Sequence, residues 1–240
     1  SCRGDSHRIR ARAGARCVAM KLLALDTSTE ACSAALAIGD QIRERFTLDG
    51  SHSERILPMV HELLAEAGIA LSQLDAIAFG RGPGSFTGLR IAAGVTQGLA
   101  FGANLPVVPV SSLAALAQGQ DTDRVLAAFD ARMQQVYWGA YVRNADGSME
   151  LTGTEIVFAP DAVPIPEAGE WLGAGSGWDQ YGKTLSSRIG PCLRHWKPKA
   201  APHARFTAIL GIAAFQRGGA IAPDAALPVY IRDEVATKAK

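Results

Sequence analysis

The sequence predicts an α/β protein built from two similar lobes, and three observations support this class. An apolar strand that ends in aspartate, followed by a short polar turn and a returning strand, occurs at residues 22–26 and again at 126–130. Helix-like and strand-like segments alternate between these two copies, as in an α/β fold with an internal duplication. No internal linker is long enough to separate the halves, so we expect two packed lobes.

The first half opens with three predicted antiparallel strands. Residues 21–26 form a short apolar run. Residues 31–38 alternate small and apolar residues, a Gly39-Asp40 turn follows, and residues 41–48 alternate again. Residues 53–67 then repeat apolar side chains at helical spacing, and Gly68 follows as a stop signal. We therefore expect a three-stranded meander followed by an amphipathic helix.

A second helix is predicted after a glycine-rich segment. A buried strand at residues 75–80 runs into residues 80–88, and a helix follows at 89–101, with Thr87 as its N-cap and Gly102 at its end. Gly94 and its neighbours are small, so another backbone could approach this helix closely. Each glycine costs a helix about 1 kcal/mol relative to alanine, and close contact must offset that cost.

The second half repeats the hairpin at residues 125–141. Further predicted elements are a strand at 107–110 with Ser111 and Ser112 capping the next helix, a strand at 154–158, a proline-rich loop, a glycine-rich segment at 172–177, an apolar helix at 206–215 and an edge segment at 227–232. We expect residues 1–19 to be a disordered tail or upstream segment, 20–111 to form the first lobe, with 208–240 returning to it, and 112–207 to form the second.

Composition excludes several classes of protein. The chain has 240 residues, 48% of them apolar, and none of its apolar runs approaches the roughly 20 residues that span a bilayer. Its four cysteines form no Cys-x-x-Cys pair, which is typical of a reduced compartment, so a cytoplasmic location without a membrane partner is expected. The net charge of the chain is +1, and without the arginine-rich residues 1–19 the net charge is about −3. A body with this charge does not by itself indicate nucleic-acid binding.

Residues 80–88, with the sequence GRGPGSFTG, lie where backbone amides at the start of a helix can hold an anion. They lack the Gly-Lys-Ser/Thr end of a Walker loop, and a dinucleotide fingerprint fails at Ser85. A nucleophile elbow fails because Pro83 stands where glycine is required. Two interpretations remain open: a structural turn or partner-facing loop, and an anion site.

Asp26 and Asp130 end the two repeated strands. In an actin-like or sugar-kinase-like protein such carboxylates lie across a cleft and hold Mg-phosphate, whereas the simpler interpretation is that aspartate ends a strand. Neither following turn contains glycine, and Glu30 would repel phosphate. We therefore expect a degenerate cleft without hydrolysis. Gly173 and Gly175 could form the backbone wall of an adenosine pocket or a loop that is tight for its own sake.

No catalytic residue and no metal site are expected. His52 and His61 are nine residues apart, so they do not form the i,i+4 pair of a helical metal site. No serine stands in the context that a serine hydrolase requires.

Five segments, residues 22–30, 52–58, 80–98, 129–138 and 228–230, together resemble the TsaB family, formerly called YeaZ. The resemblance covers residues 20–232, and the run GRGPGSFTGLR is its most specific part because no generic nucleotide motif explains it. It implies the two-lobed fold of the acetate kinase, Hsp70 and actin class, in which a ribonuclease H-like unit is duplicated.

The resemblance also implies a function. Members of the family are non-catalytic scaffold subunits for N6-threonylcarbamoyladenosine (t6A) modification of tRNA. They bind TsaD, the subunit that carries the metal and transfers threonylcarbamoyl, and help to recruit the ATPase TsaE. A homodimer and contact with tRNA through the complex are further expectations. No cofactor is expected, although an adenine nucleotide could bind weakly at the interface of the complex.

In that family the first lobe presents a helical face to TsaD or to a second copy. The corresponding interface residues here are Arg55, Met59, Thr87, Arg90 and Gly94. The alternative function is a small-molecule kinase or ATPase of the same fold, which the pair of Asp26 and Asp130 motivates.

Overall fold

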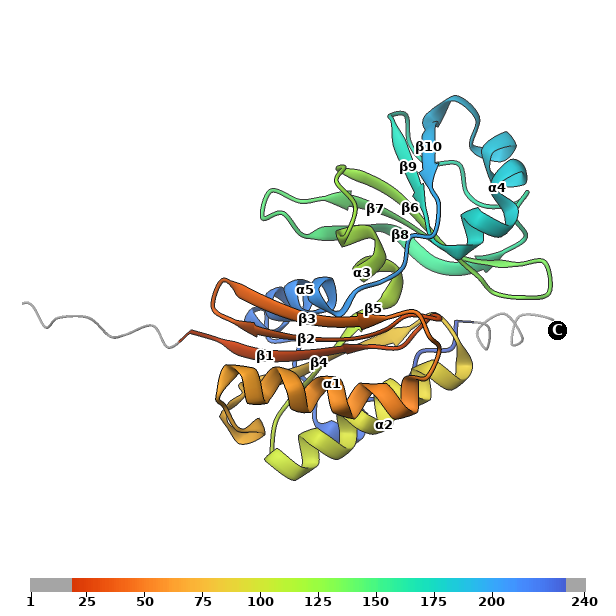
Figure 1. Cartoon of the computed structure of the whole chain (residues 1–240). Helices are drawn as coiled ribbons and strands as arrows, with labels where there is room; N and C mark the ends of the chain where they lie inside the picture. The colour runs from red at the N-terminus through yellow and green to blue at the C-terminus, as the bar shows by residue number, and fades with distance from the viewer. Residues whose placement is uncertain (1–18, 232–240) are drawn as a thin grey trace, which may run out of the picture.

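The chain forms two stacked lobes, each with its own five-stranded sheet (Figure 1). The computed structural model describes residues 19–231, so the expected tail lies outside the described residues except for Ala19. The first sheet has the order β3-β2-β1-β4-β5, formed by β1 (Lys21–Asp26), β2 (Cys32–Ile38), β3 (Gln41–Thr47), β4 (Ala76–Gly82) and β5 (Val107–Ser111).

The second sheet repeats this topology. Its order, read in the same sense, is β8-β7-β6-β9-β10, formed by β6 (Arg124–Asp130), β7 (Val136–Arg143), β8 (Met149–Phe158), β9 (Trp171–Ala174) and β10 (Leu193–Lys197). In both sheets the first three strands are antiparallel and the last two are parallel. The predicted α/β duplication is therefore confirmed, and its topology is that of the actin-like class.

Helices cover both faces of each sheet. Alternation along β1 directs Leu23 and Leu25 toward α1 (His52–Ala67) and α2 (Phe86–Ala103), and Leu22 and Ala24 toward α5 (Ala204–Gln216). On the second sheet, α3 (Ser112–Gln118) packs on one face and α4 (Ser176–Ile189) on the other. Three short 3-10 turns complete the fold: η1 (Leu71–Gln73), η2 (Gly190–Cys192) and η3 (Pro223–Ala225).

Several predicted boundaries were wrong. Helix α2 begins at Phe86 because the Ser85 hydroxyl, and not Thr87, accepts the N–H of Gly88 (3.4 Å). It ends at Ala103, with Asn104 in the left-handed conformation as its C-cap, and not at Gly102. The segment at residues 227–231 is not a strand; the Val229 N–H donates to the Arg81 carbonyl at 2.8 Å.

Helix α4 and strand β10 were not predicted. Two of the five buried positions in α4 are glycines, so its apolar repeat is hard to see in the sequence. Strand β10 lies at the edge of its sheet and four of its five residues are exposed, so it lacks the alternation of a half-buried strand.

A buried carboxylate joins the two lobes. The Glu155 side chain, from β8, is 8% exposed and accepts hydrogen bonds from the hydroxyls of Ser111 and Tyr141. Arg81, at the end of β4, places its guanidinium 3.8 Å from the other carboxylate oxygen. Burial, together with the negative charge of Glu155, raises the pKa of Tyr141 well above its usual value, so the phenol stays protonated and donates. Two residues from each lobe therefore share one network.

Replacing Tyr141 with phenylalanine tests the contribution of this network to stability. The Tyr141→Phe variant removes one donor to a buried carboxylate, so we expect the free energy of unfolding in urea to fall by about 1–3 kcal/mol. A matched control is Asp146→Asn, which weakens the exposed 3.9 Å ion pair with Arg217 between the same lobes and should leave stability close to that of the wild type. Equal stability of Tyr141→Phe and the wild type would show that the network contributes little.

Candidate functional site

Asp26, at the end of β1, is enclosed by protein. It is 1% exposed, and its Oδ1 accepts hydrogen bonds from the Ser28 N–H (2.9 Å) and hydroxyl (2.6 Å). Its Oδ2 lies against Gly80, where a Cβ atom would come within 2.3 Å. Burial raises the pKa of Asp26, and the hydrogen bonds from Ser28 offset only part of this effect.

Two helices close over this carboxylate. Ser112, the first residue of α3, and Thr207 of α5 are both fully buried beside it; the Thr207 hydroxyl lies close enough to the carboxylate to lower its pKa, against the larger effect of burial. The lining around Asp26 therefore consists of small hydroxyl groups and glycine. This leaves no open approach for a hydrated cation or a phosphate.

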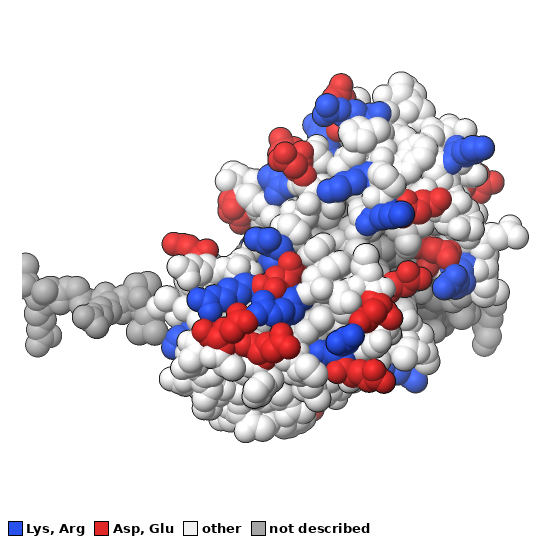
Figure 2. All heavy atoms as spheres, viewed as in Figure 1, with Lys and Arg blue, Asp and Glu red and all other residues white. Residues whose placement is uncertain are grey.

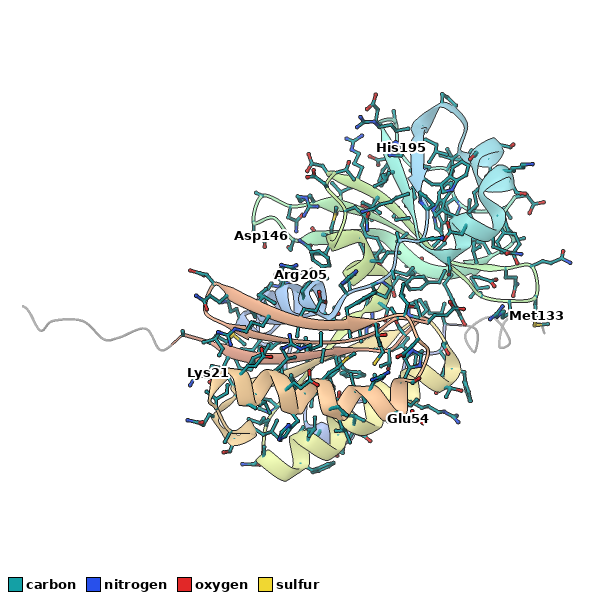
Figure 3. All side chains as sticks on the ribbon, viewed as in Figure 1. Lys21, Glu54, Met133, Asp146, His195 and Arg205 are labelled. Carbon is teal, nitrogen blue, oxygen red and sulfur yellow. The ribbon has the colours of Figure 1, made fainter. Side chains whose placement is uncertain are left out.

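Asp130, at the end of β6, has a different environment. Its Oδ1 accepts hydrogen bonds from the Arg132 N–H (2.9 Å) and the Tyr181 hydroxyl (3.4 Å), and its Oδ2 lies 3.4 Å from the Arg132 guanidinium. The carboxylate thereby supports a turn in which Arg132, Met133 and Gln134 all have positive φ. Figure 3 shows Met133 projecting at the tip of this turn. Asp26 and Asp130 thus bind separate sets of partners.

The glycines of residues 80–88 allow two backbone segments to touch. A Cβ on Gly84 would lie 2.2 Å from the Ser28 carbonyl oxygen, and one on Gly88 would lie 1.9 Å from that of Thr27. The Ser85 N–H donates to the Ser28 carbonyl (2.7 Å), and the Thr27 hydroxyl donates to the Gly88 carbonyl (2.7 Å). Of the two interpretations left open for this motif, the geometry favours a structural turn.

The glycines before α4 are also surrounded by the chain itself. A Cβ on Gly173 would come within 2.5 Å of the Trp178 indole, and one on Gly175 would come within 2.2 Å of the Ala128 carbonyl oxygen. Gly175 has φ 106° and precedes the first residue of α4, which further favours glycine there. Of the two interpretations of Gly173 and Gly175, this geometry favours a loop whose glycines are required by packing within the chain, and not the wall of an adenosine pocket.

The predicted interface residues are divided between surface and core. Thr87, Arg90 and Gly94 are exposed on α2, and Arg55 is exposed on α1, where it pairs with Asp49 at 3.0 Å. Met59 is only 9% exposed and packs in the core beneath α1. Its side chain therefore contributes little to the surface.

An aromatic cluster at the start of α2 was not predicted. Phe86 is 56% exposed, and the Arg90 guanidinium lies 3.7 Å above its ring. The Arg90 Nε donates to the Tyr230 hydroxyl (3.1 Å), and the Tyr230 ring lies 5.6 Å from that of Phe86. The sequence offered no signal for this cluster, since Tyr230 lies 140 residues away from Arg90.

The outer face of α2 carries a glycine stripe, which we define as Gly94, Gly98 and Gly102. All three are exposed, and a Cβ built on any of them meets no atom within 4 Å. The helix contains a single charged residue, Arg90, and Phe101 near its end is 62% exposed. Figure 2 accordingly shows the part of the first lobe below α1 as nearly free of charged atoms.

Residues 19–231 contain no group of three or more histidine, cysteine, aspartate or glutamate side chains placed to hold a metal ion. Over the same residues, the helices are all too short or too polar to cross a membrane.

Comparison with known proteins identifies relatives of this chain. Residues 48–166 match the model of the family described as TsaD, tRNA N6-adenosine threonylcarbamoyltransferase. The tRNA threonylcarbamoyladenosine biosynthesis protein TsaB of Escherichia coli K12 is 42% identical over 227 residues, which cover 91% of this chain and 97% of that protein. The Haemophilus influenzae protein of the same name is 39% identical over 233 residues, with 91% and 96% covered.

A solved structure is similar over nearly its whole length. YeaZ from Pseudomonas aeruginosa superposes with a TM-score of 0.82 at 48% sequence identity, covering 88% of this chain and 99% of that one. Whole-length similarity in both sequence and structure, together with the duplicated fold, shows that this chain belongs to the TsaB (YeaZ) family.

Proposed function

We propose that this chain is a scaffold subunit, without chemistry of its own, in the synthesis of threonylcarbamoyladenosine in tRNA, and that it binds a TsaD-type transferase through α1 and α2. The names of its relatives support the pathway. The proposed binding to a TsaD-type protein rests on the exposed glycine stripe on α2.

Among residues 19–231, nothing packs against the glycine stripe. An exposed glycine in a helix costs about 1 kcal/mol relative to alanine, and here a methyl group would meet no obstacle at any of the three positions. Glycines on one helix face allow a second helix to approach closely. A partner helix lying along the stripe would bury Phe101 and contact the cluster of Phe86, Arg90 and Tyr230. Arginine and tyrosine are among the residue types that often dominate binding energy.

A TsaD-type protein is the proposed partner because the family model of TsaD matches residues 48–166, about half of this chain. Two proteins with related folds could pair through equivalent surfaces, as the two copies of a homodimer do. The same face would form a homodimer when that partner is absent. TsaE would join the resulting pair, tRNA would reach the pair as its substrate, and any adenine nucleotide would bind weakly at the interface of the complex.

The absence of chemistry is proposed from the two strand-end aspartates. Asp26 is buried beneath α3 and α5, Asp130 shapes its own turn, and the nearby glycines are in contact with the chain itself. The rival function, a kinase or ATPase of the same fold, would need both carboxylates open to a shared metal and phosphate. The burial of Asp26 argues against it.

Reconstitution tests the scaffold role directly. TsaD, TsaE, tRNA and threonylcarbamoyl-adenylate are incubated with and without this chain, and modified adenosine is measured by mass spectrometry of the digested tRNA. We expect modification to need the chain. Equal modification in its absence would exclude the role, and phosphoryl transfer by the purified chain alone, lost in Asp26→Ala, would favour the kinase.

Replacing Gly94 with leucine separates folding from docking. The side chain would enter open space, and leucine favours a helix, so we expect the Gly94→Leu chain to gain up to about 1 kcal/mol in stability. Binding to TsaD, measured by titration calorimetry, should weaken by about 5- to 150-fold, since overpacking a close contact typically costs about 1–3 kcal/mol. Ser187→Leu, on the exposed side of α4, is the matched control and should bind normally. Unchanged binding by Gly94→Leu would place the interface elsewhere.

Asp26→Asn tests whether the buried carboxylate has a catalytic use. Its raised pKa means that the folded state binds a proton more tightly than the unfolded chain, so the ionised form destabilises the fold as pH rises above the ordinary value of 3.8. We expect the variant to gain stability relative to the wild type between acidic and neutral pH in denaturant titrations, and to support tRNA modification fully. Loss of modification with an intact fold would show that the carboxylate has a function.

A further inference from the structure

The second lobe segregates its charges along the chain. Residues 144–179 contain seven acidic residues and no lysine or arginine, whereas the next 21 residues, 180–200, contain no acidic residue and five basic ones: Lys183, Arg188, Arg194, Lys197 and Lys199. Because residues 20–240 have a net charge of about −3, this basic block stands out from the rest of that sequence.

The block folds into α4, η2 and β10, and its cations remain on the surface. All five side chains are exposed, and none of them takes part in an ion pair within the described residues 19–231. Arg45 and Arg55 of the first lobe, by contrast, pair with neighbouring acids. Exposed cations without acidic partners favour the approach of a polyanion.

Strand β10 adds an aromatic ring to these charges. Trp196 is 37% exposed, and its ring stacks on Trp178 with 6.3 Å between centroids. The inner side of the ring rests against Gly182, where a Cβ would come within 2.9 Å. The indole is therefore held rigidly with one part open to solvent. A rigid aromatic beside cations is the combination with which proteins hold single-stranded nucleic acid.

A groove of about 330 Å³ runs beside the strand. One wall consists of Arg194, His195, Trp196, Lys197 and Pro198, and the other residues lining it are Gln120, Asp121, Thr122, Glu170 and Leu172. The acids Asp121 and Glu170 would repel phosphate. A nucleic-acid backbone would therefore follow the β10 wall.

We propose that the β10 surface, defined as Arg194, His195, Trp196, Lys197 and Lys199, binds RNA directly through its phosphate backbone. That the RNA is the tRNA substrate rests on the proposed function. Figure 3 shows His195 in the upper part of the second lobe. It lies far from Glu54, which marks helix α1 in the first lobe. A transferase docked on α2 would leave the β10 surface open, so protein and RNA can bind together.

The test uses the full chain without other proteins. Binding of a fluorescent, unmodified tRNA transcript is followed by anisotropy between about 50 and 200 mM salt, the range over which phosphate contacts weaken strongly. The Arg194→Ala/Lys197→Ala/Lys199→Ala variant is compared with Lys21→Ala/Arg205→Ala/Arg217→Ala. The second variant removes the same charge from the first lobe, where Figure 3 shows Lys21 and Arg205.

We expect the β10 variant to bind at least about tenfold more weakly at roughly 100 mM salt, and its slope of log affinity against log salt to shrink by about two to three, close to one per lost contact. The control variant should bind like the wild type. Equal weakening of both variants, no RNA binding by the wild type at low salt, or a preference for phosphatidylserine vesicles over RNA would overturn the proposal.

Because this measurement omits TsaD, its result is independent of the docking proposal. A β10 variant that binds TsaD normally and loses RNA would support the surface even if reconstitution showed the scaffold role to be wrong. Conversely, normal RNA binding by the β10 variant would remove this inference and leave the scaffold role standing.

Discussion

The close contact between the turn at residues 27–28 and the loop at residues 84–88 determines much of the first lobe. It is made by two glycines, Gly84 and Gly88, which have no room for a side chain, and by hydrogen bonds in both directions between the segments. The contact sets where α2 begins and occupies the region at the ends of β1 and β4. That region is where a strand-loop-helix arrangement would otherwise present amides to an anion. This one contact therefore fixes the start of α2 and fills the place where an anion could otherwise bind.

The elements that could be predicted from sequence are those with a strong local pattern. The three opening strands and α1, with Gly68 at its end, follow from alternation, helical spacing and a glycine stop. The duplication could be predicted because both strands of the repeat end in aspartate, and the matching order of the two sheets confirms it. Helix α4 could not be predicted because glycines occupy two of its buried positions. Strand β10 could not be predicted because its exposed residues do not alternate in polarity.

The candidate site was harder to predict because its chemistry depends on residues far apart in the chain. Nothing near Asp26 in sequence reveals that Ser112 and Thr207 cover it. The roles of Gly84 and Gly173 likewise depend on Ser28 and Trp178, which local reasoning does not connect with them. At the interface, spacing alone could not distinguish buried Met59 from exposed Arg55, because the two are one helical turn apart on a helix whose orientation depends on the sheet beneath it.

The exchange of helices between the lobes affects how the first lobe is completed. Helix α3 follows the last strand of the first sheet yet packs on the second, and α5 follows the last strand of the second sheet yet packs on the first. Each sheet is thus covered on one face by the helix that follows the last strand of the other sheet. The first lobe is therefore completed only by α5, which the chain reaches after it has passed through the whole second lobe.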